Sequence, residues 1–159
     1  MHKQEAYMRL GRQMLGRTAG ETDILANLAN ISALLMEYVK DISWVGFYYV
    51  KGNQLILGPF QGRSACTRLM IGKGVCGTCV AEDRAIVVPD VTKFPGHVAC
   101  DSRSRSEIVV PIRIDDKVVM VLDMDSMTKG RFDEVDENML LDIASFVEDI
   151  IRKGLGREV

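Results

Sequence analysis

The chain has 159 residues and a net charge of −2, and 47% of its residues are hydrophobic and 26% charged. This balance is typical of a globular protein, it gives no basic surface for nucleic acid, and no apolar run approaches the roughly 20 residues of a membrane span. Because the start has no signal-peptide core, we expect a cytoplasmic protein with neither a membrane nor a nucleic-acid partner, folded as a single domain over residues 1–159.

Two helices are predicted before the first strand. Segment 2–17 has apolar side chains at helical spacing, namely Tyr7, Leu10 and Met14. Segment 23–40 carries a wider apolar stripe at steps of three and four residues, formed by Ile24, Leu28, Ile31, Leu35 and Tyr38. Apolar residues that recur in this way predict amphipathic helices, and the second helix should bury one broad face.

The middle of the chain is predicted to form short strands separated by turns. β-Branched and aromatic residues, bounded by turn residues, predict strands over 42–50, 54–58, 67–71, 86–89 and both arms of a hairpin at 107–126. A glycine-rich entry and a short helical turn are predicted at 72–83. Residues 90–106 form a long loop, which in a compact domain is more often functional than idle. A final helix is predicted over 132–154, with its N-cap near Asp133.

Helices at both ends and strands between them describe an α+β domain. We expect a mostly antiparallel sheet with the N- and C-terminal helices on one face. The opposite face, overhung by the 90–106 loop, is then left for a ligand pocket. Aromatic residues in 42–50 alternate imperfectly, which indicates that both faces of this strand are covered. The long amphipathic terminal helices favour a homodimer.

Four cysteines, all in the middle third of the chain, suggest three kinds of chemistry. In a reducing compartment they are buried apolar residues, metal ligands or redox groups rather than permanent bridges. Cys76-x2-Cys79 with His97-x2-Cys100 has the spacing of a zinc site, but the first pair leads into an apolar helix instead of a knuckle-like turn. The same pair matches a redox dithiol, yet a hairpin precedes it where a βαβ unit is needed. We expect no metal or other cofactor, and Cys79 as a buried apolar residue.

Cys100 has the most reactive setting of the four. It opens a polar loop, and Arg103 and Arg105 follow it with positive charge that favours a thiolate. Its flanking residues are polar, so burial as an ordinary apolar side chain does not suit it. Cys66 and Cys76 are its potential thiol partners.

The hairpin at 107–126 ends in acidic residues, which are unusual in a strand. Asp123 and Asp125 are two residues apart and therefore share a face. With a three-residue turn Glu107 lies across from Asp125 on that face, whereas a two-residue turn points it the other way unless a bulge intervenes. Three acids around a pocket bind an ammonium group, and their mutual repulsion raises one pKa enough to make a proton donor. The alternative is a strand end that runs into a solvated loop.

Taken together, these motifs resemble the free methionine-(R)-sulfoxide reductases, which are single-domain members of the GAF fold. The similarity runs from about residue 44 to 132. Its most specific feature is the cysteine spacing of 10 and then 24 residues from Cys66 through Cys76 to Cys100. The other matching segments are Gly72-Lys-Gly-Val-Cys-Gly-Thr78, Val87-Val-Pro-Asp-Val91, Phe94-Pro-Gly-His-Val-Ala-Cys-Asp101, Ser104-Arg-Ser-Glu-Ile-Val-Val-Pro111 and Val121-Leu-Asp-Met-Asp-Ser126.

The resemblance implies roles for individual residues. Cys100 is then the attacking thiol, Cys66 the resolving thiol and Cys76 an auxiliary one. The proton donor to the departing oxygen is Asp125 or Glu107. Substrate is held by a set of aromatic and acidic side chains, namely Trp44, Tyr48, Glu107, Asp123 and Asp125. Cys79 departs from the family pattern, which more often has a small apolar residue there, and it receives no role.

The implied activity is thiol-dependent reduction of free L-methionine-(R)-sulfoxide. The reaction passes through a Cys100 sulfenic acid and a Cys66–Cys100 disulfide, which thioredoxin reduces. The alternative is a GAF domain without catalysis that binds a small molecule or senses redox state. Only 33 residues follow the last predicted strand, which leaves little chain for the output domain that a sensor normally carries.

Overall fold

The computed structural model describes residues 2–156, which form one six-stranded sheet with four α-helices. The strands lie in the order β3-β2-β1-β6-β5-β4, and every neighbouring pair is antiparallel. They are β1 (Trp44–Lys51), β2 (Gln54–Gln61), β3 (Arg68–Met70), β4 (Ile86–Val88), β5 (Ser106–Ile114) and β6 (Lys117–Ser126). The helices are α1 (Lys3–Thr18), α2 (Ile24–Tyr38), α3 (Gly74–Glu82) and α4 (Glu134–Gly154), with a 3-10 turn at Val91–Lys93. The predicted α+β class is confirmed.

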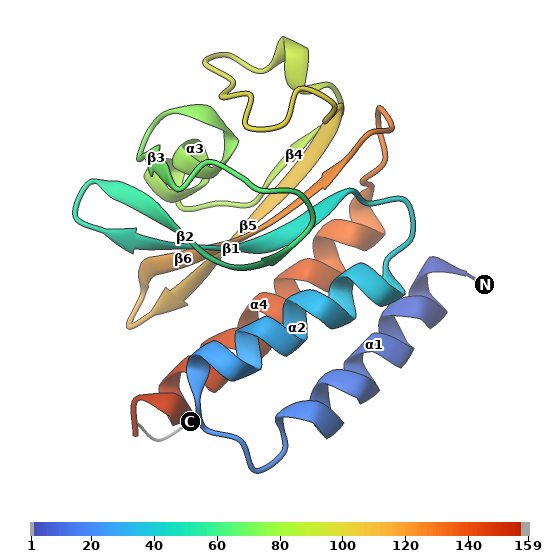
Figure 1. Ribbon diagram of the computed structural model, residues 1–159, viewed down its shortest axis with the longest axis vertical. Coiled ribbons are helices and arrows are strands. Elements are labelled where there is room, and N and C mark those ends of the chain that lie inside the picture. The colour runs from blue at the N-terminus through green and yellow to red at the C-terminus, as the bar shows by residue number, and fades with distance from the viewer. Residues whose placement is uncertain (1, 157–159) are drawn as a thin grey trace.

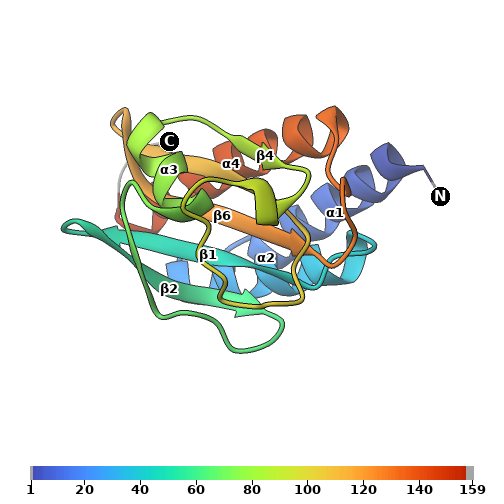
Figure 2. The same ribbon diagram turned by 90° about the horizontal axis from the view of Figure 1, so that it is seen from above.

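The three long helices lie on one side of the sheet. Figure 1 shows α2 and α4 against the sheet and α1 packed on the outer side of α2, and the apolar stripes of all three helices join the larger of two buried apolar clusters. Seen from above, α3 and the chain between β4 and β5 lie over the opposite face (Figure 2). The predicted separation of helices from a pocket face is therefore confirmed. None of the described helices has both the length and the apolar character needed to cross a membrane.

Strand β1 is buried on both faces. Val45 and Phe47 belong to the cluster beneath the helices, while Trp44 and Tyr48 belong to a second apolar cluster on the α3 side. All four side chains are at most 5% exposed. This explains why the aromatic residues of β1 do not alternate with polar ones, and it places two large rings on the pocket face.

The β5–β6 hairpin combines a two-residue turn with a bulge. Asp115 and Asp116 form the turn with φ angles of 52° and 63°, the left-handed conformation that tight hairpins require. The register then shifts between Ile112 and Arg113. Because of this shift, Glu107 pairs with Asp125 across the strands instead of pointing to the helices. Of the two registers compatible with the sequence, the structure has the two-residue turn with a bulge.

Candidate functional site

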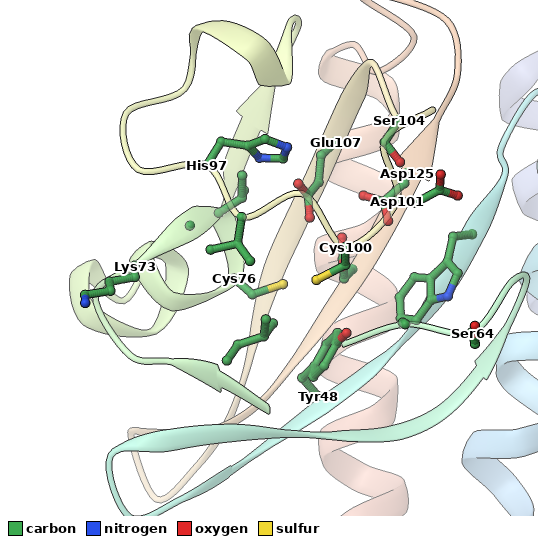
Figure 3. Close-up of a pocket in the computed structure, with 17 residues that line it drawn as sticks. Tyr48, Ser64, Lys73, Cys76, His97, Cys100, Asp101, Ser104, Glu107 and Asp125 are labelled. Carbon is green, nitrogen blue, oxygen red and sulfur yellow. The ribbon is translucent and has the colours of Figure 1, made fainter. Parts of the chain in front are cut away.

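Three carboxyl groups gather at one end of β5 and β6. Glu107 on β5 lies opposite Asp125 on β6, and Asp123 precedes Asp125 by two residues on β6. All three side chains therefore face one pocket. Glu107 and Asp123 are only 8% and 5% exposed, and Asp125 is partly buried. Figure 3 shows the carboxyl group of Glu107 directed into the space above the two cysteine sulfur atoms of the pocket. The predicted acidic cluster is thus assembled by the hairpin register.

These carboxyl groups are crowded together without a basic partner. Burial and then the charge of Asp123 raise the pKa of Glu107, and burial and then the charge of Glu107 raise the pKa of Asp125. Within residues 2–156 no Lys or Arg forms an ion pair with any of the three. Oδ1 of Asp123 is buried and accepts no hydrogen bond. The cluster therefore holds protons readily and suits a cationic ligand group.

Two aromatic rings form the wall beside the acids. The rings of Trp44 and Tyr48 stack with their centroids 5.9 Å apart, and Phe60 stacks on the far side of Trp44 at 5.3 Å. Gly46 makes this packing possible, since a Cβ there would collide with the Cβ of Phe60. A flat apolar wall of this kind suits the side chain of an amino acid.

The same rings hold the loop that follows β2. Nε1 of Trp44 donates to the carbonyl of Arg63 at 3.1 Å, and the hydroxyl of Tyr48 donates to the carbonyl of Cys66 at 2.9 Å. The aromatic wall therefore fixes the backbone of Cys66 next to the pocket, although the Cys66 side chain is not among those that line it.

A disulfide joins Cys66 to Cys100 over the pocket, with a Cα–Cα distance of 5.5 Å. It connects the loop after β2 to the loop before β5, which are 34 residues apart in sequence. Cys100 lines the pocket directly. With the bridge formed, the pocket encloses about 50 Å³, which holds only a few water molecules.

The other two cysteines are free and buried. Cys76, on α3, lines the pocket, and its sulfur points toward the same space as that of Cys100 (Figure 3). Burial is the main cause that raises the pKa of the Cys76 thiol, and the charge of Asp123 is the second cause. Cys79 is fully buried, donates from Sγ to the carbonyl of Val109 at 3.9 Å, and has its pKa raised by burial to about 12. The expected apolar environment of Cys79 is confirmed, and neither thiol has the depressed pKa of a redox dithiol.

The zinc-like pattern of the sequence is not assembled. Cys100 is bonded to Cys66, and Cys79 lies outside the pocket that Cys76 and His97 share. Across the described part of the chain, the one group of three potential ligands with atoms within 4.8 Å of one another is Cys76, Glu107 and Asp123.

The two arginines after Cys100 contact other groups. Arg103 donates to the Asp101 carboxylate through Nε at 3.2 Å and Nη2 at 3.0 Å, and hydrogen bonds from Arg103 lower the pKa of Asp101 to about 2. Arg105 donates to the carbonyls of Ser102 and Ser104. The charge of Arg103 is therefore largely balanced by its neighbour.

Several lining residues were not predicted to line the pocket, although His97 had been considered as a zinc ligand. They are Ser64, Ala65, Leu69, Lys73, Gly74, Val75, His97, Val98, Asp101 and Ser104. Four of them belong to the long loop predicted over 90–106, whose length was the only indication. Nδ1 of His97 is buried without a hydrogen-bond partner, and burial lowers the pKa of this imidazole. Burial therefore disfavours the charged imidazolium form of His97.

Comparisons with known proteins agree with this geometry. The sequence model of the GAF domain family matches residues 22–152. The free methionine-R-sulfoxide reductase of Escherichia coli (strain K12) is 46% identical over 151 residues, which cover 95% of this chain and 92% of that protein.

Two solved structures are also close in fold. The free methionine-R-sulfoxide reductase from Neisseria meningitidis, in complex with its substrate, superposes with a TM-score of 0.93 at 42% identity, covering 98% of this chain and 95% of that one. The reduced form of fRMsr of Staphylococcus aureus has a TM-score of 0.88 at 49% identity, covering 91% and 94%. The chain therefore belongs to the GAF domain family and, within it, to the free methionine-R-sulfoxide reductases.

Proposed function

We propose that this chain reduces free L-methionine-(R)-sulfoxide with Cys100 as nucleophile and Cys66 as resolving thiol. The observation that carries the proposal is the disulfide between these two residues, formed over a pocket that three carboxyl groups line. A ligand sensor has no need for a bridge at this place, whereas a thiol reductase produces one in each turnover. The relatives named as free methionine-R-sulfoxide reductases support the choice of substrate.

The first step transfers the sulfoxide oxygen to the enzyme. The Cys100 thiolate attacks the sulfoxide sulfur, while a protonated carboxyl group, Asp125 or Glu107, gives a proton to the oxygen. The S–O bond of the sulfoxide breaks, methionine leaves with its sulfur reduced to a thioether, and Cys100 becomes a sulfenic acid. The raised pKa values of Asp125 and Glu107 favour this step, because either group keeps its proton to higher pH than an exposed carboxyl group does.

The second step protects Cys100 from further oxidation. The Cys66 thiol attacks the sulfenic sulfur, the S–O bond breaks, and the oxygen leaves as water. The sum of the two steps converts one sulfoxide and two thiols to methionine, one disulfide and one water. An external dithiol, by family resemblance thioredoxin, then reduces the disulfide.

The acids and the loop explain why a free amino acid is preferred. The substrate ammonium group binds among Glu107, Asp123 and Asp125, where Oδ1 of Asp123 lacks a donor. Backbone N–H groups of the loop before β5 receive the carboxylate. A methionine inside a polypeptide has neither charged group and is excluded by the enclosed space.

The oxidised pocket has little free space and no free thiol at Cys100. Its volume is about 50 Å³, and Cys100, which lines it, is bonded to Cys66. The sulfoxide reacts only after the disulfide has been reduced, because Cys100 must be a free thiolate to attack it. Turnover therefore follows a ping-pong order, in which the reductant acts before the next sulfoxide binds.

A Cys66→Ser variant separates the two steps. It is expected to release one methionine per active site in a single turnover, because Cys100 and the acids are intact, and then to stop with thioredoxin as reductant. We expect steady-state turnover with thioredoxin to fall roughly 100-fold. Quenched-flow measurement of methionine gives the burst, and coupled NADPH oxidation gives the steady state. A Cys76→Ser variant is the matched control and should keep cycling. Normal cycling by Cys66→Ser would assign the resolving role elsewhere, to Cys76.

A further inference from the structure

The two loops that the disulfide joins carry an unusual charge. Segments 61–73 and 90–106 contain six Lys or Arg residues and two acidic residues, whereas the whole chain has a net charge of −2. These surface segments around the disulfide are therefore positive, while the rest of the chain, including the pocket carboxyl groups beside Cys100, carries the negative charge. Such an arrangement steers the approach of a charged partner.

Four of these cations lie around the mouth of the pocket, and we call them the cationic rim: Arg63, Lys73, Arg103 and Arg105. The charge of Arg63 helps to lower the pKa of Asp101. Nη2 of Arg103 forms an ion pair with the Asp101 carboxylate at 3.0 Å. Lys73 lines the pocket, but its ammonium group points outward (Figure 3). Arg63, Lys73 and Arg103 are exposed. Asp101 balances only one of the four charges.

The two sulfur atoms of the bridge differ in position. Cys100 lines the pocket together with Ser64 and Ala65, whereas Cys66, which follows them, does not. Cys66 and Cys100 are both partly exposed, but only Cys100 lines the pocket. A protein thiol that approaches from solvent therefore meets Cys66 without entering the pocket.

We infer that the cationic rim is the docking surface of the reductant, a dithiol protein with acidic side chains around its dithiol, and that this dithiol attacks Cys66. The inference rests on the proposed reductase function. The reductant thiolate forms a bond to Cys66 Sγ, the Cys66–Cys100 bond breaks, and Cys100 leaves as the thiolate. The second reductant thiol then displaces Cys66, so that the reductant carries the new disulfide and both enzyme thiols are reduced.

The substrate does not account for this charge. A free amino acid is a zwitterion with no net charge, so a positive field hardly changes its rate of encounter. A protein with an acidic surface gains much more, since electrostatic complementarity raises association rates and weakens with salt. The cationic rim therefore suits the half-reaction in which a protein reductant reduces the disulfide.

The test compares Arg63→Glu with Arg9→Glu, which makes the same charge change on exposed α1, on the other face of the sheet. With an acidic thioredoxin, we expect kcat/KM for the reductant to fall about three- to tenfold in Arg63→Glu and to stay unchanged in Arg9→Glu. The loss should disappear at about 0.5 M salt, where charges are screened within roughly 4 Å. An equal loss in both variants, or a loss that persists in high salt, overturns the docking surface.

Dithiothreitol separates this inference from the proposed function. It is a neutral small dithiol, so both variants should reduce free methionine-(R)-sulfoxide with it at the wild-type rate. Wild-type protein that is inactive with dithiothreitol contradicts the reductase function itself. The attack site is tested with thioredoxin whose second active-site cysteine is replaced by serine, which traps the mixed disulfide. Peptide mapping should find it on Cys66, and a mixed disulfide on Cys100 overturns the assignment.

Discussion

A Cys100→Ser variant is expected to lose reduction of free methionine-(R)-sulfoxide by a factor of about 10³ or more. A serine hydroxyl is a far weaker nucleophile than a thiolate, and it forms neither a sulfenic acid nor a disulfide. Methionine release should be measured by amino-acid analysis with dithiothreitol as reductant, so that recycling by a protein partner does not limit the rate.

A second serine variant controls for the loss of a thiol. Cys79→Ser removes a sulfur that lies outside the pocket and bonds only to the Val109 carbonyl. It should keep most of its activity once its folding has been verified by circular dichroism. If Cys100→Ser also remained active, the nucleophile would be another residue and the mechanism would be wrong.

Asp125→Asn and Glu107→Gln are expected to identify the proton donor. Burial and neighbouring carboxylates raise the pKa of both groups, so the protonated form persists as pH rises and is lost only above the raised pKa. The single-turnover rate of the wild type should therefore fall on the alkaline side. An amide cannot transfer the proton, so the variant at the donor should be slower by about 10²- to 10⁴-fold and should lack this alkaline fall.

Two further variants test whether the effect is specific. Asp101 also lines the pocket, but its pKa of about 2 keeps it ionised, so Asp101→Asn should retain the alkaline fall. Asp123→Asn should mainly raise KM, because Oδ1 of Asp123 is placed to accept from the ammonium group. An unchanged pH profile in both Asp125→Asn and Glu107→Gln would exclude these carboxyl groups as donors.

Periodicity was sufficient to predict the layers of the fold. The segments predicted as long helices are α1, α2 and α4, and Asp133 caps α4 by accepting from the N–H groups of Val135 and Asp136. The spacing of apolar residues indicates which face of a helix is buried, and it can be determined from the sequence without tertiary information. Pattern alone did not fix the hairpin register, because the bulge, whose extra residue is Val119 on β6, has no marker such as glycine.

Long-range polar contacts were invisible in the sequence. Asp136 is fully buried and accepts from Lys3 at 2.8 Å, Tyr7 at 2.9 Å and Arg131 at 3.1 Å, which joins α1 to α4. An acidic residue in the first turn of a helix is ordinarily solvated. The position of Asp136 in the sequence therefore indicated only the start of a helix. The partners are as far as 133 residues away in the sequence.

The candidate site was predictable where chemistry made residues conspicuous. Acids at a strand end and a cysteine in a polar loop indicated Asp123, Asp125 and Cys100. The pairing of Cys100 with Cys66 followed only from the family resemblance, since spacing left Cys66 and Cys76 as alternatives. Ser64 was missed as a lining residue because its surroundings do not differ from those of an ordinary loop. His97 was missed because its spacing to Cys100 was interpreted only as that of a zinc site.

The most direct test is a count of thiols during one turnover. Fully reduced protein is mixed with one equivalent of free methionine-(R)-sulfoxide, and methionine, free thiols and disulfide-linked peptides are measured together. We predict that two thiols disappear for each methionine formed and that the bridge joins Cys66 to Cys100, leaving Cys76 and Cys79 free. Binding of the sulfoxide without loss of thiols, as expected of a sensor, would contradict the account.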